Sequence, residues 1–144
     1  MQLSRAAPIQ DPRPMHSAFL VEDSPPARET LTAALAESAD IVAVGYAESE
    51  LDAVEWLRNH ETPDLVVLDL FLNAGTGLGV LARIRQLSLG LRVIVLTNSA
   101  TSLLRRSCLL LGAEAVYDKA DNLEDFLDHC RHMFEPGADG PSRH

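Results

Sequence analysis

Lysine is nearly absent from this sequence: Lys119 is the only one among 144 residues. The other cationic side chains are arginines, whose planar guanidinium differs in shape and hydration from the compact lysine ammonium. We infer that position 119 is one where arginine cannot replace lysine. Lys119 is therefore treated as a candidate functional residue.

Cysteine and long apolar runs are also scarce, which excludes several classes of protein. The two cysteines, Cys108 and Cys130, have neither metal-ligand spacing nor a secretory context, so they are predicted to be reduced and buried in helices. No run approaches the roughly 18 apolar residues of a membrane span, and residues 1–14 contain no signal-peptide core. We expect a cytoplasmic protein that does not associate with membranes.

Acidic residues are missing from one long segment. The chain carries a net charge of −9, yet positions 70–113 contain no Asp or Glu. The same segment holds five arginines, which are Arg83, Arg85, Arg92, Arg105 and Arg106. The overall charge argues against direct nucleic-acid binding, which needs clustered Lys and Arg. We interpret the basic segment as a solvated face, in preference to a docking surface for an acidic partner.

Short apolar runs alternate with amphipathic stretches along the middle of the chain. Strands are predicted at 18–21, 41–44, 65–70, 92–96 and 115–117, and helices near 25–38, 49–60, 76–87, 100–111 and 122–133. Residues 1–16 are predicted to be a disordered tail and 135–144 a flexible one, which leaves 17–134 as one domain. The alternation predicts a parallel sheet covered on both faces, with right-handed crossovers.

Polar residues lie at the carboxyl ends of four of the five predicted strands. They are Glu22 and Asp23, Asp69, Thr97, and Lys119. Because the carboxyl ends of parallel strands lie at one edge of a sheet, these side chains are expected to meet there. Three neighbouring carboxylates stay ionised only beside a cation, and an all-oxygen cluster suits Mg²⁺. A carboxylate in such a site can act as a nucleophile towards phosphorus.

The pattern resembles the receiver domain of two-component response regulators over about 17–134. The resemblance rests on the pair Glu22–Asp23, the run from Pro63 to Leu70 with its Asp69, Gly77, Thr97, the pair Gly112–Ala113, and Lys119. It implies an α/β fold of the flavodoxin-like, doubly wound kind. The implied sheet has five parallel strands in the order 2-1-3-4-5, with five helices around it.

The resemblance also implies a role for each site residue. Asp69 would accept a phosphoryl group from a sensor histidine kinase or a histidine phosphotransfer protein. Thr97 would hydrogen-bond the phosphoryl oxygens, and Lys119 would pair first with Asp69 and then with the phosphoryl group. Phosphorylation would draw Thr97 inward and shift the last two strands and helices, which is the conformational switch. The domain would not be an enzyme, apart from slow self-dephosphorylation.

Mg²⁺ is the cofactor that the resemblance implies. Asp23, Asp69 and the backbone carbonyl of Phe71 would bind the ion. Glu22 would act on it directly or through water.

Four positions depart from the family pattern. Glu22 stands where Asp is commoner, and Asn73 replaces the usual Pro. Ala120 replaces the Pro that follows the lysine, so no cis peptide is expected there. Val116 occupies the position of the family's switch aromatic, and Tyr117 comes one residue later. Since adjacent strand residues face opposite ways, Tyr117 is not expected to take over that role.

Two enzyme classes fit the sequence less well. Gly75, Gly77 and Gly79 mimic a dinucleotide-binding loop, but Val80 stands where the third glycine belongs and no ribose-binding acid follows. We interpret this stretch as a flexible loop and a helix start. Phosphatases with an aspartate nucleophile generally carry a second acid two residues later, where this chain has Phe71.

A second candidate function is a degenerate receiver-like interaction module that phosphorylation does not control. The Glu22–Asp23 pair and Val116 favour this alternative. Asp69, Thr97 and Lys119 favour a working receiver.

The helix predicted at 100–111 carries more leucine than one buried stripe needs. These residues are Leu103, Leu104, Leu109, Leu110 and Leu111. They predict a contact surface on the fourth helix, fifth strand and fifth helix for an unknown protein target or a second copy of the chain. The other interpretation places this helix deeper in the core. The ten residues after Phe134 are too few to fold alone, so we expect a stand-alone or an excised receiver.

The histidines suggest no site. They are His16, His60, His129, His132 and His144. All five are interpreted as solvated, and no metal site is assigned to them.

Overall fold

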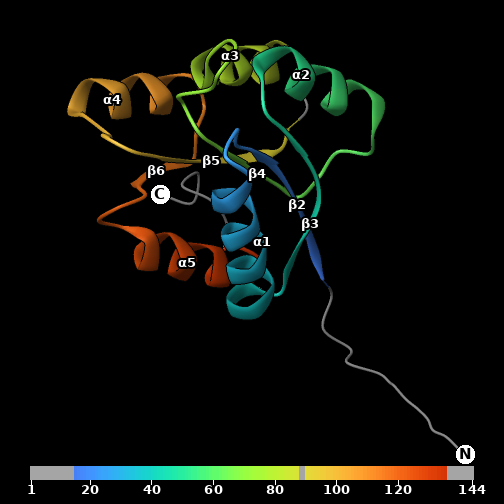
Figure 1. Ribbon diagram of the computed structural model, residues 1–144, viewed down its shortest axis with the longest axis vertical. Helices are drawn as coiled ribbons and strands as arrows, with labels where there is room; N and C mark the ends of the chain where they lie inside the picture. The colour runs from blue at the N-terminus through green and yellow to red at the C-terminus, as the bar shows by residue number, and fades with distance from the viewer. Residues whose placement is uncertain (1–14, 88–89, 136–144) are drawn as a thin grey trace, which may run out of the picture.

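A five-stranded sheet runs through the middle of the molecule, with helices on both faces (Figure 1). The structure is a computed structural model, and it describes residues 15–87 and 90–135. Every pair of neighbouring strands is parallel. Counted along the chain, the strands lie in the order 2-1-3-4-5, which confirms the predicted doubly wound fold.

The strands end on the same edge of the sheet. They are β2 (His16–Val21), β3 (Ile41–Ala47), β4 (Leu65–Leu68), β5 (Arg92–Thr97) and β6 (Ala115–Asp118). Their order across the sheet is β3-β2-β4-β5-β6. The order reverses between β2 and β4, and ligands of such sheets bind at the carboxyl ends of the strands at this point.

Two layers of helices enclose the sheet. One face is covered by α1 (Pro25–Ala39) and α5 (Leu123–His132), and the other by α2 (Glu50–Asn59), α3 (Gly77–Leu87) and α4 (Ser102–Leu110) (Figure 1). The hydroxyls of Ser24, Ser49 and Thr101 each accept an amide hydrogen bond at the start of α1, α2 and α4. Gly112 follows the end of α4 with a φ of 104°, which glycine adopts easily.

Alternate residues of the central strands pack against opposite helix layers. In β4, Leu65 and Val67 contact the layer of α1 and α5, whereas Val66 and Leu68 contact the layer of α2, α3 and α4. All four are at most 2% exposed. Because β4 is buried on both faces, its sequence is an unbroken apolar run.

The domain starts slightly earlier than the sequence predicts. β2 begins at His16, which pairs with Ile41 and stacks on Phe134 at a ring distance of 4.0 Å. The next residue, Ser17, donates its backbone N–H to Asp64 at 2.9 Å. His16 is therefore a strand residue rather than part of a tail or a solvated histidine. Residues 1–14 and 136–144, which make up most of the two predicted tails, lie outside the described residues.

The two cysteines agree with the sequence prediction. Cys108 in α4 and Cys130 in α5 are buried and form no disulfide. Burial raises the pKa of Cys130 to about 12, so this side chain stays a thiol at neutral pH. As for membrane spans, none of the helices in the described ranges is both long and apolar enough to cross a bilayer.

An ionic cluster at the amino-terminal edge joins β5, β6 and α5. Arg92 Nε and Nη2 donate to the Glu114 carboxylate at 2.6 and 2.7 Å, and His129 Nε2 lies 2.7 Å from the same carboxylate. The other ring nitrogen of His129 lies 2.8 Å from the hydroxyl of Tyr117. The prediction that Arg92 and His129 are solvated was therefore wrong. Their side chains are only 26% and 23% exposed, because α5 packs over the starts of both strands.

This cluster holds Glu114 in its charged form. Burial by itself would raise the pKa of Glu114, but the hydrogen bonds and charges of His129 and Arg92 outweigh it and lower the pKa to about 2.

Glu114→Gln is expected to lower the free energy of unfolding by about 1.5–3 kcal/mol near neutral pH, the usual value of hydrogen bonds to a charged group. The pKa of Glu114 lies below its ordinary 4.5 in the folded protein, so its stabilising effect is complete above that pH and is lost as the pH falls towards 2. The deficit of the variant should therefore shrink at about pH 3 in urea unfolding. An exposed control, Glu55→Gln, should show no deficit. A deficit of equal size at both pH values would contradict this account of Glu114.

Candidate functional site

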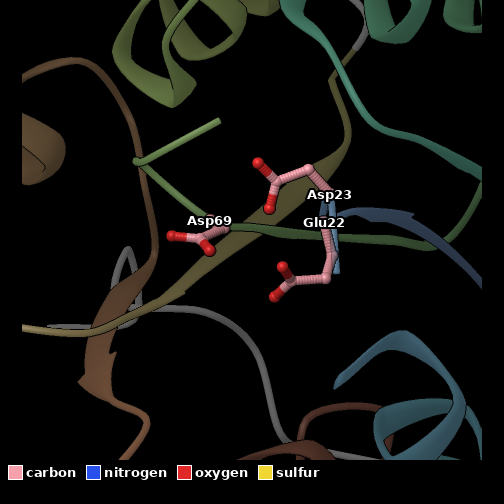
Figure 2. Close-up of side chains that lie close together, drawn as sticks. All are labelled: Glu22, Asp23 and Asp69. Atoms are coloured by element: carbon pink, nitrogen blue, oxygen red, sulfur yellow. The ribbon is translucent and has the colours of Figure 1, made fainter. Parts of the chain in front are cut away.

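Three carboxylates meet where β2 and β4 end. The two strands are neighbours, with Val21 paired to Leu68, so Glu22 and Asp23 project beside Asp69 (Figure 2). One oxygen from each carboxylate lies within 4.8 Å of the others. The side chains point into the same space at the sheet edge (Figure 2).

Asp69 is a buried carboxylate whose two oxygens both accept hydrogen bonds. It is only 7% exposed. Thr97 Oγ1 donates to Oδ1 at 2.7 Å, and the backbone N–H of Phe71 donates to the same oxygen at 3.1 Å. Lys119 Nζ donates to Oδ2 at 2.9 Å. These donors and the ammonium charge offset the cost of burying the carboxylate.

Lys119 bridges two carboxylates. Its ammonium contacts Oε1 of Glu22 as well as Oδ2 of Asp69. Burial by itself would lower the pKa of Lys119, but the hydrogen bonds and charges of Glu22 and Asp69 outweigh it and raise the pKa above its ordinary value. The side chain is therefore charged at neutral pH.

Glu22 and Asp23 have different surroundings although they are adjacent. Glu22 is 4% exposed, and both of its oxygens are engaged, Oε1 with Lys119 and Oε2 with the backbone N–H of Ser24 at 3.1 Å. The carboxylate of Asp23 makes no hydrogen bond or ion pair with any other residue that the structure describes. Of the pair, Asp23 is the acid whose oxygens are open to a ligand.

The charge and the donor atoms of this cluster fit a divalent cation. Three carboxylates share one ammonium, so two formal negative charges are left without a partner. Carboxylate and carbonyl oxygens are the ligands that Mg²⁺ takes in proteins. Asp23, Asp69 and the backbone carbonyl of Phe71 would hold the ion, with Glu22 beside them.

Gly77 allows the loop after β4 to fold back over Asp69. A Cβ at this position would lie 2.2 Å from the Asp69 carbonyl oxygen and 2.7 Å from the Leu70 Cα. The backbone N–H of Gly77 donates to the Leu70 carbonyl at 3.0 Å. Gly77 is one of the residues on which the family resemblance rests, and the structure gives a steric reason for a glycine there.

Val116 and Tyr117 face opposite sides of the sheet, as predicted. Val116 is 4% exposed and packs in the layer of α2, α3 and α4. Tyr117 packs with Phe126 in the layer of α1 and α5, with its hydroxyl at His129. Tyr117 therefore does not fill the position of a switch aromatic next to α4. The peptide bond before Ala120 is trans, also as expected.

Sequence reasoning missed two residues that shape the site. Arg28 of α1 donates from Nη1 to the backbone carbonyl of Glu22 at 2.8 Å. Asp118 accepts from the backbone N–H groups of Ala120 at 2.9 Å and Ala100 at 3.3 Å, which joins the loops after β5 and β6. These hydrogen bonds lower the pKa of Asp118. Only the position of Asp118 next to the lone lysine could have pointed to it.

The fold and the site together define a doubly wound α/β domain with a cluster of three carboxylates at its strand ends. The profile of the response regulator receiver domain family matches residues 18–131, and the chain belongs to this family. A curated relative is BvgA of Bordetella pertussis, named as a transcription regulator of virulence factors. It is 33% identical over 117 residues, which cover 81% of this chain and 56% of BvgA. The chain thus spans about half the length of the curated relatives it matches.

Two solved structures of response regulators that are more than 25% identical to this chain have a similar fold. The phosphorylated cyanobacterial phytochrome response regulator RcpA is 26% identical with a TM-score of 0.73, covering 89% of this chain and 99% of RcpA. The response regulator Rcp1 in its Mn²⁺-bound form is 27% identical with a TM-score of 0.68, covering 82% of this chain and 91% of Rcp1.

Asp23→Asn is expected to weaken Mg²⁺ binding roughly tenfold or more, because a hard-cation site loses a charged ligand. The matched variant Glu22→Gln should weaken it less, because the oxygens of Glu22 are engaged by Lys119 and Ser24. Isothermal titration calorimetry with MgCl₂ measures both. Equal losses, or a larger loss in Glu22→Gln, would contradict this division of roles.

Proposed function

We propose that this receiver domain accepts a phosphoryl group on Asp69 from a sensor histidine kinase or a histidine phosphotransfer protein, and signals by a conformational switch. The observation that carries the proposal is the hydrogen bonding of Asp69. One of its oxygens contacts Thr97 and the other contacts Lys119. A hydroxyl donor and an ammonium thus already flank the atoms that would receive the group.

The transfer forms one bond and breaks one. A carboxylate oxygen of Asp69 attacks phosphorus, and the bond from phosphorus to the donor imidazole nitrogen breaks. The electron pair of the broken bond leaves with the imidazole, which is neutral once that nitrogen carries a proton, and the phosphoryl group brings its own negative charge to the site. Lys119 then pairs with a phosphoryl oxygen, and the hydroxyl of Thr97 turns from the carboxylate to another phosphoryl oxygen.

The cluster of acids supplies the cofactor site in this proposal. Bound Mg²⁺ would neutralise charge on the phosphoryl oxygens during transfer. The chain itself positions the acceptor through Thr97, Lys119 and the Phe71 backbone. It acts as a phosphoryl recipient rather than an enzyme, and its turnover is limited to slow self-dephosphorylation.

The switch in this proposal does not run through an aromatic side chain. Tyr117 is held on the far face by His129, so its ring does not follow a movement of Thr97. The backbone N–H of Lys119 donates to the Thr97 carbonyl at 2.9 Å, and Asp118 binds the loop that leads to α4. Movement of Thr97 would reach α4 and β6 through these main-chain contacts.

An exposed leucine surface on α4 supports a protein partner. Leu103, Leu109 and Leu110 are 74%, 48% and 71% exposed. Leu104 and Leu111 instead pack against the core. Of the five leucines, only these two follow the other interpretation, in which the helix lies deeper in the core. We propose that the exposed leucines, with β6 and α5, contact a target protein or a second copy of the chain in the cytoplasm.

Purified protein is expected to gain one phosphoryl group when it is incubated with acetyl phosphate and Mg²⁺. Intact-mass spectrometry measures the gain. Asp69→Asn should abolish it because the acceptor oxygen is replaced. Asp64→Asn, at the opposite end of the same strand, should leave it unchanged. An unmodified wild-type protein would favour the degenerate interaction module instead.

Leu110→Glu is expected to reduce association with a partner or a second copy while leaving the melting temperature nearly unchanged. Leu104→Glu should instead destabilise the fold by about 2–5 kcal/mol, the range for disrupting a packed apolar site. Thermal unfolding and sedimentation velocity, with and without acetyl phosphate, separate the two effects. Strong destabilisation by Leu110→Glu would place that residue in the core and remove the proposed surface.

A further inference from the structure

Glu50, the first residue of α2, holds the loop that follows Asp69. Its backbone N–H donates to the Ala74 carbonyl at 3.1 Å, and its carboxylate oxygen Oε1 accepts the backbone N–H of Thr76 at 2.9 Å. The preceding residue, Ser49, forms a parallel bridge with Ala74. One residue of α2 thus binds the loop from both its main chain and its side chain.

Two glycines leave the space that the Glu50 side chain occupies. A Cβ at Gly75 would lie 2.4 Å from the Glu50 Cβ. A Cβ at Gly79 would lie 2.4 Å from both carboxylate oxygens and from the carbon that joins them. Two of the three glycines that mimic a nucleotide loop in the sequence therefore form a slot for a carboxylate of the same chain. The prediction of a flexible loop did not anticipate this contact.

The loop segment that Glu50 binds is in direct contact with the backbone around Asp69. Thr76 forms an antiparallel bridge with Phe71, and the next residue, Gly77, lies against the Asp69 carbonyl. Phe71 in turn donates its N–H to Asp69 and carries the carbonyl expected to bind Mg²⁺. A continuous set of contacts therefore runs from Glu50 through Thr76 and Phe71 to Asp69.

We propose that Glu50 is a positioning residue for the phosphoryl-acceptor site: by filling the slot at Gly75 and Gly79, it fixes the Phe71 backbone where the cation and Asp69 need it. The proposal rests on the proposed phosphoryl-acceptor function and adds a residue on α2 to that site. In this proposal Glu50 acts through the loop and is not itself a ligand of the cation or of the phosphoryl group.

A purely structural role for Glu50 makes different predictions. Although Glu50 belongs to α2, its carboxylate lies at the start of α3, where a negative charge stabilises that helix through the helix dipole. If this were its only role, removing the carboxylate would change the stability of the fold and nothing else. Positioning predicts a loss of Mg²⁺ affinity at temperatures far below melting, where the whole domain is folded. It also predicts that glutamine, which keeps an oxygen acceptor for Thr76, restores the affinity.

Glu50→Ala is expected to weaken Mg²⁺ binding about tenfold, the lower end of the range for residues that orient metal ligands, and to slow phosphorylation by acetyl phosphate. Glu50→Gln should stay close to wild type. Glu55→Ala, an exposed glutamate on the same helix, is the matched control and should change neither quantity. Calorimetry with MgCl₂ and intact-mass time courses are the readouts.

Gly79→Ala provides a second and independent test. Alanine favours a helix more than glycine does, so a helix-propensity effect alone would stabilise this variant. The slot predicts a loss instead: the new methyl group displaces the Glu50 side chain, and Mg²⁺ affinity falls about as far as in Glu50→Ala. When Gly79→Ala is combined with Glu50→Ala, it should cause no further loss of Mg²⁺ affinity, because no Glu50 carboxylate is left to displace.

Hydrogen exchange makes the test independent of the metal and of phosphorylation. The amides of Phe71 and Thr76 should exchange faster in Glu50→Ala and in Gly79→Ala than in wild type. Unchanged exchange and Mg²⁺ affinity in folded Gly79→Ala would overturn the proposal, whatever the fate of Glu50→Ala. A wild-type protein that binds Mg²⁺ but is never phosphorylated would refute the proposed function, while the exchange data would still decide the role of Glu50.

Discussion

The burial of one carboxylate, that of Asp69, imposes a requirement that the rest of the site meets. An ionised acid that is 7% exposed needs donors for both oxygens and a compensating charge. Thr97, the Phe71 backbone and Lys119 supply them. Since Lys119 also pairs with Glu22, the cluster keeps an excess of negative charge around the open oxygens of Asp23. This excess of negative charge fits the binding of a divalent cation.

Sheet topology brings these groups together from distant parts of the chain. Glu22 and Lys119 are 97 positions apart, and they meet because β2, β4, β5 and β6 all end on one edge. Helices then add the finer positioning. Arg28 of α1 binds the backbone of Glu22, and Glu50 of α2 binds the loop behind Asp69. Asp69 and Glu22 are thus supported from both helix layers.

The sequence predicts most of this fold because its signals are local. Apolar runs locate each strand to within three residues, and parallel connections place Asp69, Thr97 and Lys119 on one edge. The adjacent pair of Val116 and Tyr117 is also assigned to opposite faces, because strand geometry alone decides that.

Contacts between side chains of different helices and strands could not be predicted in the same way. No periodic signal indicates that Glu22 turns to Lys119, that His129 joins Glu114, or that Gly79 makes room for Glu50. Each depends on how elements far apart in the sequence pack. From the sequence alone, a glycine that leaves space for another residue's side chain cannot be distinguished from a glycine that a turn requires.

The central claim is that Asp69, rather than a neighbouring acid, becomes the acyl phosphate. Treating the phosphorylated protein with sodium borohydride reduces an acyl phosphate to an alcohol and marks the acceptor permanently. Tandem mass spectrometry of the tryptic peptides that carry Asp69 and the Glu22–Asp23 pair then locates the mark. We predict homoserine at position 69 and unmodified side chains at Glu22 and Asp23. Homoserine at any other aspartate, or none anywhere, would contradict the account.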